Sequence, residues 1–297
     1  MSAEGSKPRA PDMALEILRP ACTTVTFSGA FPEKIRAMAN AGFTLTEVWM
    51  SDLFEHAEGP DVAACIMKDH GVAPVALQAL RNFEGCPREE FASKLRLATA
   101  YLDICASQGI PTLVLAANTS LGAEGDTQRL IDDLGALGDL AAERGVKVAF
   151  EPIAWASHLG TLQAAVPVLA ALRHDHIGLQ IDTFHVSQEA GGAQRVAGLG
   201  TDVPVFMVEV SDHFPMDFDV LTLSRAYRLF PGEGTSDLAD QAAALAHIGY
   251  TGPLVVEVFN AYYRTCDRDT VAGKAFRSLA RFRQEMRPEN PESSTNT

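Results

Sequence analysis

Four acidic residues lie at or next to the ends of four successive short segments rich in β-branched residues. In a parallel α/β fold the carboxyl ends of such segments meet at one face, so the four carboxylates would converge there. Converging carboxylates repel one another and are costly to bury, and a divalent cation removes that cost. Oxygen ligands suit hard or borderline ions. Although each acid alone is more typical of a solvated strand end, the set predicts one bound Mn²⁺, Co²⁺ or Mg²⁺ ion, held by Glu151, Asp182, Glu209 and Glu257.

Two histidines follow these acids closely enough to transfer protons beside such an ion. His185 lies three residues after Asp182, and His158 lies in the stretch WASH that follows Glu151. Imidazole titrates near neutrality and can act as a general acid or base, although each of these residues is also consistent with a surface loop histidine. We take His185 as the first candidate for a catalytic base and His158 as the second, with His213 as a weaker one.

Two arginines stand where they could bind an anionic substrate. Arg81 follows the third strand candidate in LQALRNFEG, and Arg228 lies in SRAYRLFPGEG after the seventh. The planar guanidinium group donates two parallel hydrogen bonds to a carboxylate, which is why arginine suits this task. The alternative for Arg81 is a surface ion pair with Glu84.

The elements that must position these residues alternate regularly along the chain. The helix candidates cover 32–42, 91–109, 127–145, 162–173, 238–249 and 270–282. Eight strands alternating with helices predict an α/β fold with a parallel sheet, closed as a single (β/α)₈ TIM barrel over residues 14–286. A doubly wound open sheet is the alternative, but no GxGxxG turn follows the first strand. The tails 1–13 and 287–297 are expected to be disordered, and the strand candidates are 22–27, 45–49, 75–80, 112–117, 147–151, 178–182, 205–210 and 254–258.

Composition excludes several classes of partner. The 297 residues carry a formal charge of −14, which argues against nucleic acid and anionic membranes, because both are bound through clustered lysine and arginine. No apolar run approaches the length of about 18–20 residues that spans a bilayer. The five cysteines are scattered and form no CxxC pair, which is typical of a reducing cytoplasm. We expect a cytoplasmic protein with a small-molecule substrate, and homo-oligomers remain open.

The motifs FEPIAW, LQIDTFH, VEVSD, FPGEG and GYTGPLVVEVFN, in this order, resemble the xylose-isomerase-like superfamily of sugar phosphate isomerases and epimerases. That resemblance, from about residue 21 to 282, implies a divalent metal on the four acids. A narrower resemblance, carried by LQALRNFEG, EPIAWASHLGT and VEVFNAYYR, is to bacterial 3-dehydroshikimate dehydratases, although Glu209 replaces their usual Gln or His. It implies His185 as a catalytic group and, as substrate contacts, Arg81, His158, Ser224, Arg228 and Asn260.

The expected function is therefore that of a metal-dependent lyase that removes water from 3-dehydroshikimate to give protocatechuate. A sugar or inosose isomerase or epimerase of the same superfamily is the principal alternative, since it uses the same enolate chemistry without expelling water. A non-catalytic ligand-binding barrel and a repair nuclease of similar fold are the others. The negative charge argues against the nuclease.

Overall fold

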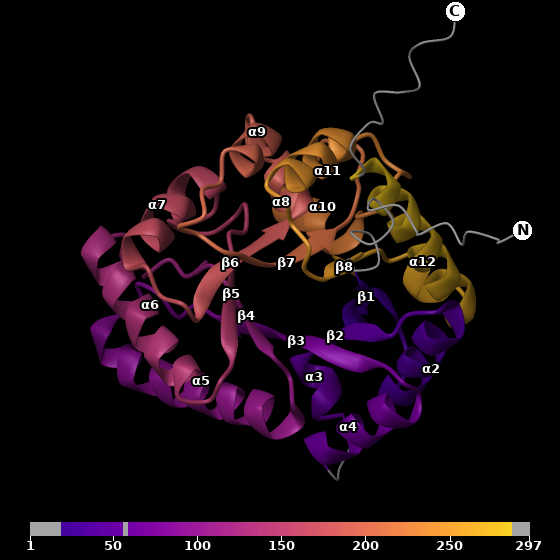
Figure 1. Cartoon of the computed structure of the whole chain (residues 1–297), viewed down its shortest axis with the longest axis horizontal. Coiled ribbons are helices and arrows are strands. Elements are labelled where there is room, and N and C mark those ends of the chain that lie inside the picture. The colour runs from indigo at the N-terminus through magenta and orange to yellow at the C-terminus, as the bar shows by residue number, and fades with distance from the viewer. Residues whose placement is uncertain (1–18, 56–58, 287–297) are drawn as a thin grey trace, which may run out of the picture.

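A computed structural model describes residues 19–55 and 59–286 of the chain. Eight parallel strands form a closed barrel in which each strand pairs with the next and the last pairs with the first (Figure 1). This confirms the predicted (β/α)₈ barrel. The strands are β1 Pro20–Thr23, β2 Leu45–Trp49, β3 Ala73–Arg81, β4 Thr112–Ala116, β5 Lys147–Glu151, β6 Ile177–Asp182, β7 Val205–Val210 and β8 Leu254–Val256.

Helices surround this barrel (Figure 1). The longer ones are α2 Phe31–Ala41, α4 Pro60–Asp69, α5 Arg88–Gln108, α6 Thr127–Ala142, α7 Leu162–Leu172, α11 Leu238–His247 and α12 Arg268–Glu285. All six helix candidates are present, whereas α4 and the short elements were not anticipated. Glycine in the left-handed conformation ends α2 and α5, as its lack of a Cβ allows. The short elements are α3 Met50–Leu53, α8 Thr183–Ser187, α9 Gly192–Ala197, α10 Val220–Ala226 and the 3₁₀ helices η1 Thr24–Thr26 and η2 Tyr263–Thr265.

The interior of the barrel changes from apolar to acidic along its strands. Successive inward-facing positions on a strand are two residues apart. Apolar residues occupy inward positions of β1, β2, β7 and β8, namely Ala21, Leu45, Met207 and Val255. Two residues further along each of these segments, the sequence places Thr23, Glu47, Glu209 and Glu257. The fold thus holds its polar groups above an apolar floor, which consists of Ala21, Leu45, Val75, Ala76, Val114, Met207 and Val255.

The first strand is shorter than predicted. The sequence favours an extended segment over 22–27, but β1 ends at Thr23 and the chain continues as η1. Threonine hydroxyls take over the backbone pairing there: Thr24 Oγ1 accepts the Trp49 N–H at 2.9 Å, and Thr26 Oγ1 accepts the Val258 N–H at 3.2 Å. Side-chain oxygens that bond backbone groups in this way compete with a regular ladder.

The ends of the predicted domain are not decided by the structure. The tails 1–13 and 287–297 lie outside the described residues, and so does the start of the predicted 14–286 domain. In the described part of the chain, no helix combines the length and the apolar character needed to cross a membrane.

Candidate active site

The barrel brings the four predicted acids together at the carboxyl ends of β5 to β8. Asp182 and Glu209 are direct neighbours in the register of β6 and β7. One carboxylate oxygen from each of Glu151, Asp182, Glu209 and Glu257 lies within 4.8 Å of the others. All four residues are buried. The sequence prediction of a convergent acid cluster therefore corresponds to a real cluster in the fold.

The chemistry of this cluster fits a divalent cation. Burial, and then the charges of Glu257 and its other acidic neighbours, raise the pKa values of Glu151 and Glu209 well above their ordinary range. Burial likewise raises the pKa of Glu257, although Arg228 opposes the shift. Glu209 Oε2 is buried and has no hydrogen-bond partner among the described residues. A set of buried carboxylate oxygens that repel one another, one of them unsatisfied, matches the ligand preference of such ions.

Arg228 is built into the acid cluster. Its Nη1 lies 2.7 Å from Asp182 Oδ2 and 3.0 Å from Glu257 Oε2, while Nε and Nη2 donate to Ser224. The side chain is only 2 % exposed and packs over the ring of Phe184. All three guanidinium nitrogens are therefore engaged within the protein. The arginine offsets part of the negative charge and fixes two of the acids.

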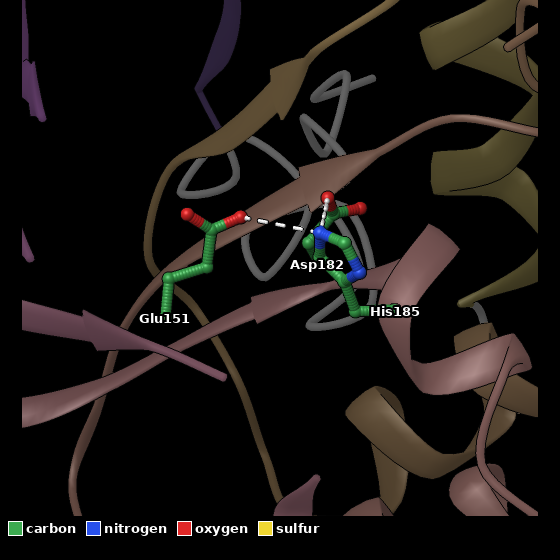
Figure 2. A group of neighbouring side chains, drawn as sticks. All are labelled: Glu151, Asp182 and His185. Carbon is green, nitrogen blue, oxygen red and sulfur yellow. Dashed lines mark ion pairs between the residues drawn. The ribbon is translucent and has the colours of Figure 1, made fainter. Parts of the chain in front are cut away.

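His185 reaches the same cluster from α8. Its Nε2 lies 3.5 Å from Asp182 Oδ2 and 3.8 Å from Glu151 Oε1, as Figure 2 shows. Its Nδ1 accepts the backbone N–H of Ala154 at 3.2 Å, so the neutral ring carries its proton on Nε2. Edge contacts with Trp155 hold the ring. Burial, and then nearby arginines, lower the pKa of His185 well below its ordinary value, so the neutral form is favoured.

Glu151, Glu257 and His185 line a pocket that has a cationic and aromatic rim. Arg81 and Arg225 are both exposed there. No ion pair involves either side chain in residues 19–55 and 59–286. The walls are completed by Trp155 and Phe259. Positively charged side chains around the opening, with buried acids beneath them, can orient an anionic substrate against a bound cation.

The other predicted substrate contacts have different surroundings. His158 is exposed and its Nε2 lies 3.0 Å from the carbonyl oxygen of Ala123. Ser224 is fully buried against Arg228. Asn260 donates to the carbonyl of Arg228 at 2.8 Å and accepts two backbone N–H groups, so its amide is occupied. The structure thus places Ser224 and Asn260 around Arg228, and their contact with substrate stays a prediction.

The alternative partner of Arg81 is engaged elsewhere. Glu84 is buried, and its Oε1 accepts the backbone N–H of Asn118 at 2.5 Å. No ion pair between Arg81 and Glu84 is present in the described part of the chain. Burial raises the pKa of the Glu84 carboxyl to about 8. Arg81 is consequently left facing the pocket.

The raised pKa of Glu84 predicts that the free energy of unfolding depends on pH, independently of the acid cluster. Between about pH 4.3 and 8 the unfolded chain ionises this carboxyl while the folded chain keeps it protonated, so the free energy of unfolding falls by up to about 1.4 kcal/mol per pH unit. Glu84→Gln keeps the Asn118 contact and removes this slope. Urea unfolding at pH 5 and pH 8 should show that the stability of the variant relative to wild type is greater at pH 8 than at pH 5. Glu90→Gln, on the exposed face of α5, is the control, and equal slopes for wild type and Glu84→Gln would contradict the expectation.

Two functional candidates escaped the sequence analysis. Glu47 on β2 is fully buried beside Glu209, and burial raises its pKa to about 8. Its signal in the sequence is an acid at an inward position of the short strand LTEVW. The second is Arg225. Arg228, three residues later, has the same chemistry, and no sequence feature tells which of the two arginines is buried.

Comparison with known proteins identifies the fold family. The model of the xylose isomerase-like TIM barrel family matches residues 35–282, which is most of the chain. The chain belongs to this family. Proteins similar to the chain in sequence include a 3-dehydroshikimate dehydratase, an inosose isomerase and a ketose 3-epimerase. The resemblance inferred from the motifs is thereby confirmed.

Two relatives and one solved structure show which members of the family the chain resembles. The chain is 33% identical over 264 residues to the 3-dehydroshikimate dehydratase of Pseudomonas putida, covering 89% of this chain and 41% of that protein. A solved xylose isomerase-like TIM barrel/4-hydroxyphenylpyruvate dioxygenase fusion protein superposes with a TM-score of 0.85 at 32% identity, covering 92% of this chain and 45% of the other. The inosose isomerase of Bacillus velezensis is 23% identical over 80% of this chain and 82% of its own length. The chain thus spans about two fifths of the dehydratase it matches.

Proposed function

We propose that this xylose isomerase-like barrel is a divalent-metal-dependent dehydratase that converts 3-dehydroshikimate to protocatechuate. One observation carries the proposal: exposed arginines without ion pairs in the described residues line the same pocket as Glu151 and Glu257, two of the four converging carboxylates. This combination suits a substrate that has both a carboxylate and a carbonyl group. The similarity to the Pseudomonas dehydratase supports it.

The roles of the residues follow from their positions. Glu151, Asp182, Glu209 and Glu257 would hold the ion, which when bound polarises the substrate carbonyl and stabilises negative charge on its oxygen. Arg228 keeps Asp182 and Glu257 in place. The aromatic walls of the pocket exclude water around the reacting ring.

His185 is proposed as the proton-transfer residue, acting at Nε2, the ring nitrogen that faces the acids. Loss of water requires that a proton leave the carbon next to the carbonyl and that the departing hydroxide receive a proton. Tautomerisation of the remaining dienone then gives the aromatic catechol. Because Nδ1 accepts the Ala154 N–H, the neutral ring holds its proton on Nε2 and can donate it to the departing hydroxide. To accept a proton at Nε2 the ring must first adopt the other tautomer, in which its Nδ1–H would oppose the Ala154 N–H. His158, which is exposed and whose Nε2 lies 3.0 Å from the Ala123 carbonyl oxygen, stays the second candidate.

The test is direct turnover. Protein loaded with Mn²⁺ is expected to convert 3-dehydroshikimate to a product with catechol ultraviolet absorbance. Exhaustive chelation should abolish the signal, and Mn²⁺, Co²⁺ or Mg²⁺ should restore it. Full activity of demonstrably metal-free protein would contradict the metal assignment.

An isomerase or epimerase acting on an inosose or ketose is the second candidate. The relationship to inosose isomerases favours it, and proton removal next to a carbonyl is common to both reactions. The same protein is therefore assayed for exchange of the α-proton of inososes and ketohexoses with deuterated water. Exchange without any catechol formation would replace the dehydratase proposal by this one.

A further inference from the structure

The two arginines on the rim differ from the buried arginine in the availability of their donors. Arg228 has every guanidinium nitrogen engaged by acids or Ser224. Arg81 and Arg225 line the same pocket, and in the described residues neither takes part in an ion pair. A substrate carboxylate in this pocket can therefore receive guanidinium hydrogen bonds from the rim arginines, whereas Arg228 would first have to release its acids.

Aromatic rings hold Arg225 in place without consuming its donors. Its guanidinium carbon lies 4.8 Å from the centre of the Phe259 ring and 5.6 Å from that of Trp155. A guanidinium packed against aromatic faces keeps its N–H groups directed from its edge, which is the geometry of a two-point contact with a carboxylate. Arg225 is thus restrained by its neighbours and still able to bind an anion.

The electrostatics of the rim point the same way. Partial desolvation in the pocket lowers the pKa of Arg225, although Glu257 opposes the shift, and the charge of Arg81 in the same pocket adds to it. Two like charges that remain unpaired beside a buried cluster of acids are stabilised when an anion lies between them. Glu257 attracts Arg225, but it also pairs with Arg228 at 3.0 Å, so it offsets only part of the charge on the rim.

We propose that Arg225, together with Arg81, binds the substrate carboxylate, and that Arg225 sets the preference of this pocket for a cyclic keto acid over a neutral polyhydroxylated ketone. This inference rests on the proposed function and assigns the carboxylate to the rim, not to Arg228. It makes Arg225 a substrate-binding residue that determines specificity.

The experiment compares two ligands that differ only in the carboxylate. Binding of 3,4-dihydroxybenzoate and of catechol to the Mn²⁺-loaded protein is followed by calorimetry and by tryptophan fluorescence, because Trp155 adjoins Arg225. Wild type should bind the acid at least about 10-fold more tightly, from charge-assisted hydrogen bonds. Arg225→Gln should weaken the acid roughly 10- to 100-fold and leave catechol within about 3-fold. Arg225→Lys should recover only part of the difference, because lysine lacks the planar fork.

Arg277→Gln is the matched control, since Arg277 is an exposed arginine on α12 and lines a separate groove with Asn40 and Phe276. It should leave both affinities unchanged. Equal affinity of wild type for acid and catechol, or an unchanged preference in Arg225→Gln, would overturn the inference. If wild type makes no protocatechuate from 3-dehydroshikimate but Arg225→Gln still loses the preference for the acid, the dehydratase proposal fails. Carboxylate binding by Arg225 then stands.

Discussion

Replacement of Asp182 by asparagine is expected to remove the metal and to reduce turnover by at least about 1000-fold. Asp182 contributes one of the four clustered carboxylate oxygens, and its Oδ2 lies 2.7 Å from Arg228 Nη1. The substitution removes one of the four anionic groups that would hold the ion, and a loss of about 3 kcal/mol of binding free energy corresponds to roughly 100-fold in metal affinity. Elemental analysis of the purified variant and a Mn²⁺ titration followed by calorimetry measure the loss.

The fold should survive this substitution. Asp182 Oδ1 accepts the backbone N–H of Phe184 at the start of α8, and asparagine is an equally good residue at such a position. Asp133→Asn is the matched control, because Asp133 is a fully buried acid paired with Arg88 outside the cluster. Normal metal content in Asp182→Asn, with wild-type turnover, would contradict the assignment of Asp182 as a ligand.

Arg228→Met is expected to be the most destabilising single change at the site when metal is withheld. Without the guanidinium, Asp182 and Glu257 remain buried with no cation, and the free energy of unfolding should fall by about 3–5 kcal/mol. Added Mn²⁺ should recover part of this loss, because the ion binds the folded state and supplies the missing positive charge. Urea unfolding with chelator and with excess Mn²⁺ gives both values.

Arg228→Lys separates charge from geometry. Lysine keeps a positive charge near the acids but cannot reproduce the contacts with Ser224, so its stability should lie between wild type and Arg228→Met. If Arg228→Met is as stable as wild type in chelator, the arginine does not compensate the acids. A Lys variant that unfolds as readily as the Met variant would show that the lost packing, and not the charge, dominates.

The sequence could predict the barrel and its acids because both depend on local pattern. The alternation of short apolar segments with amphipathic segments predicts the bounds of β5 to β8 closely. Once the strands form a barrel, the topology determines where a residue at a strand end lies. The limits of β1 could not be predicted, since the hydroxyls of Thr24 and Thr26 bond backbone groups of distant segments.

The sequence also could not predict which of the two arginines, Arg225 or Arg228, pairs with the acids and which faces the pocket. Arg225 and Arg228 are three residues apart in SRAYR, and α10 ends between them at Ala226. Beyond a helix end, helical periodicity no longer tells which side chain turns inward. Pairing of Arg228 with Asp182 and Glu257 depends on contacts between residues far apart in the chain, which only the folded barrel supplies.

The apolar floor of the barrel has a kinetic consequence. Ala21, Leu45, Val114, Met207 and Val255 pack together beneath the acids, so small molecules reach the site only from the carboxyl face of the strands. Substrate and product must then use the same opening and occupy the same space in turn. For the proposed dehydratase, product that accumulates to its dissociation constant would compete with substrate for this site, and the steady-state rate would then depend on how fast product is removed.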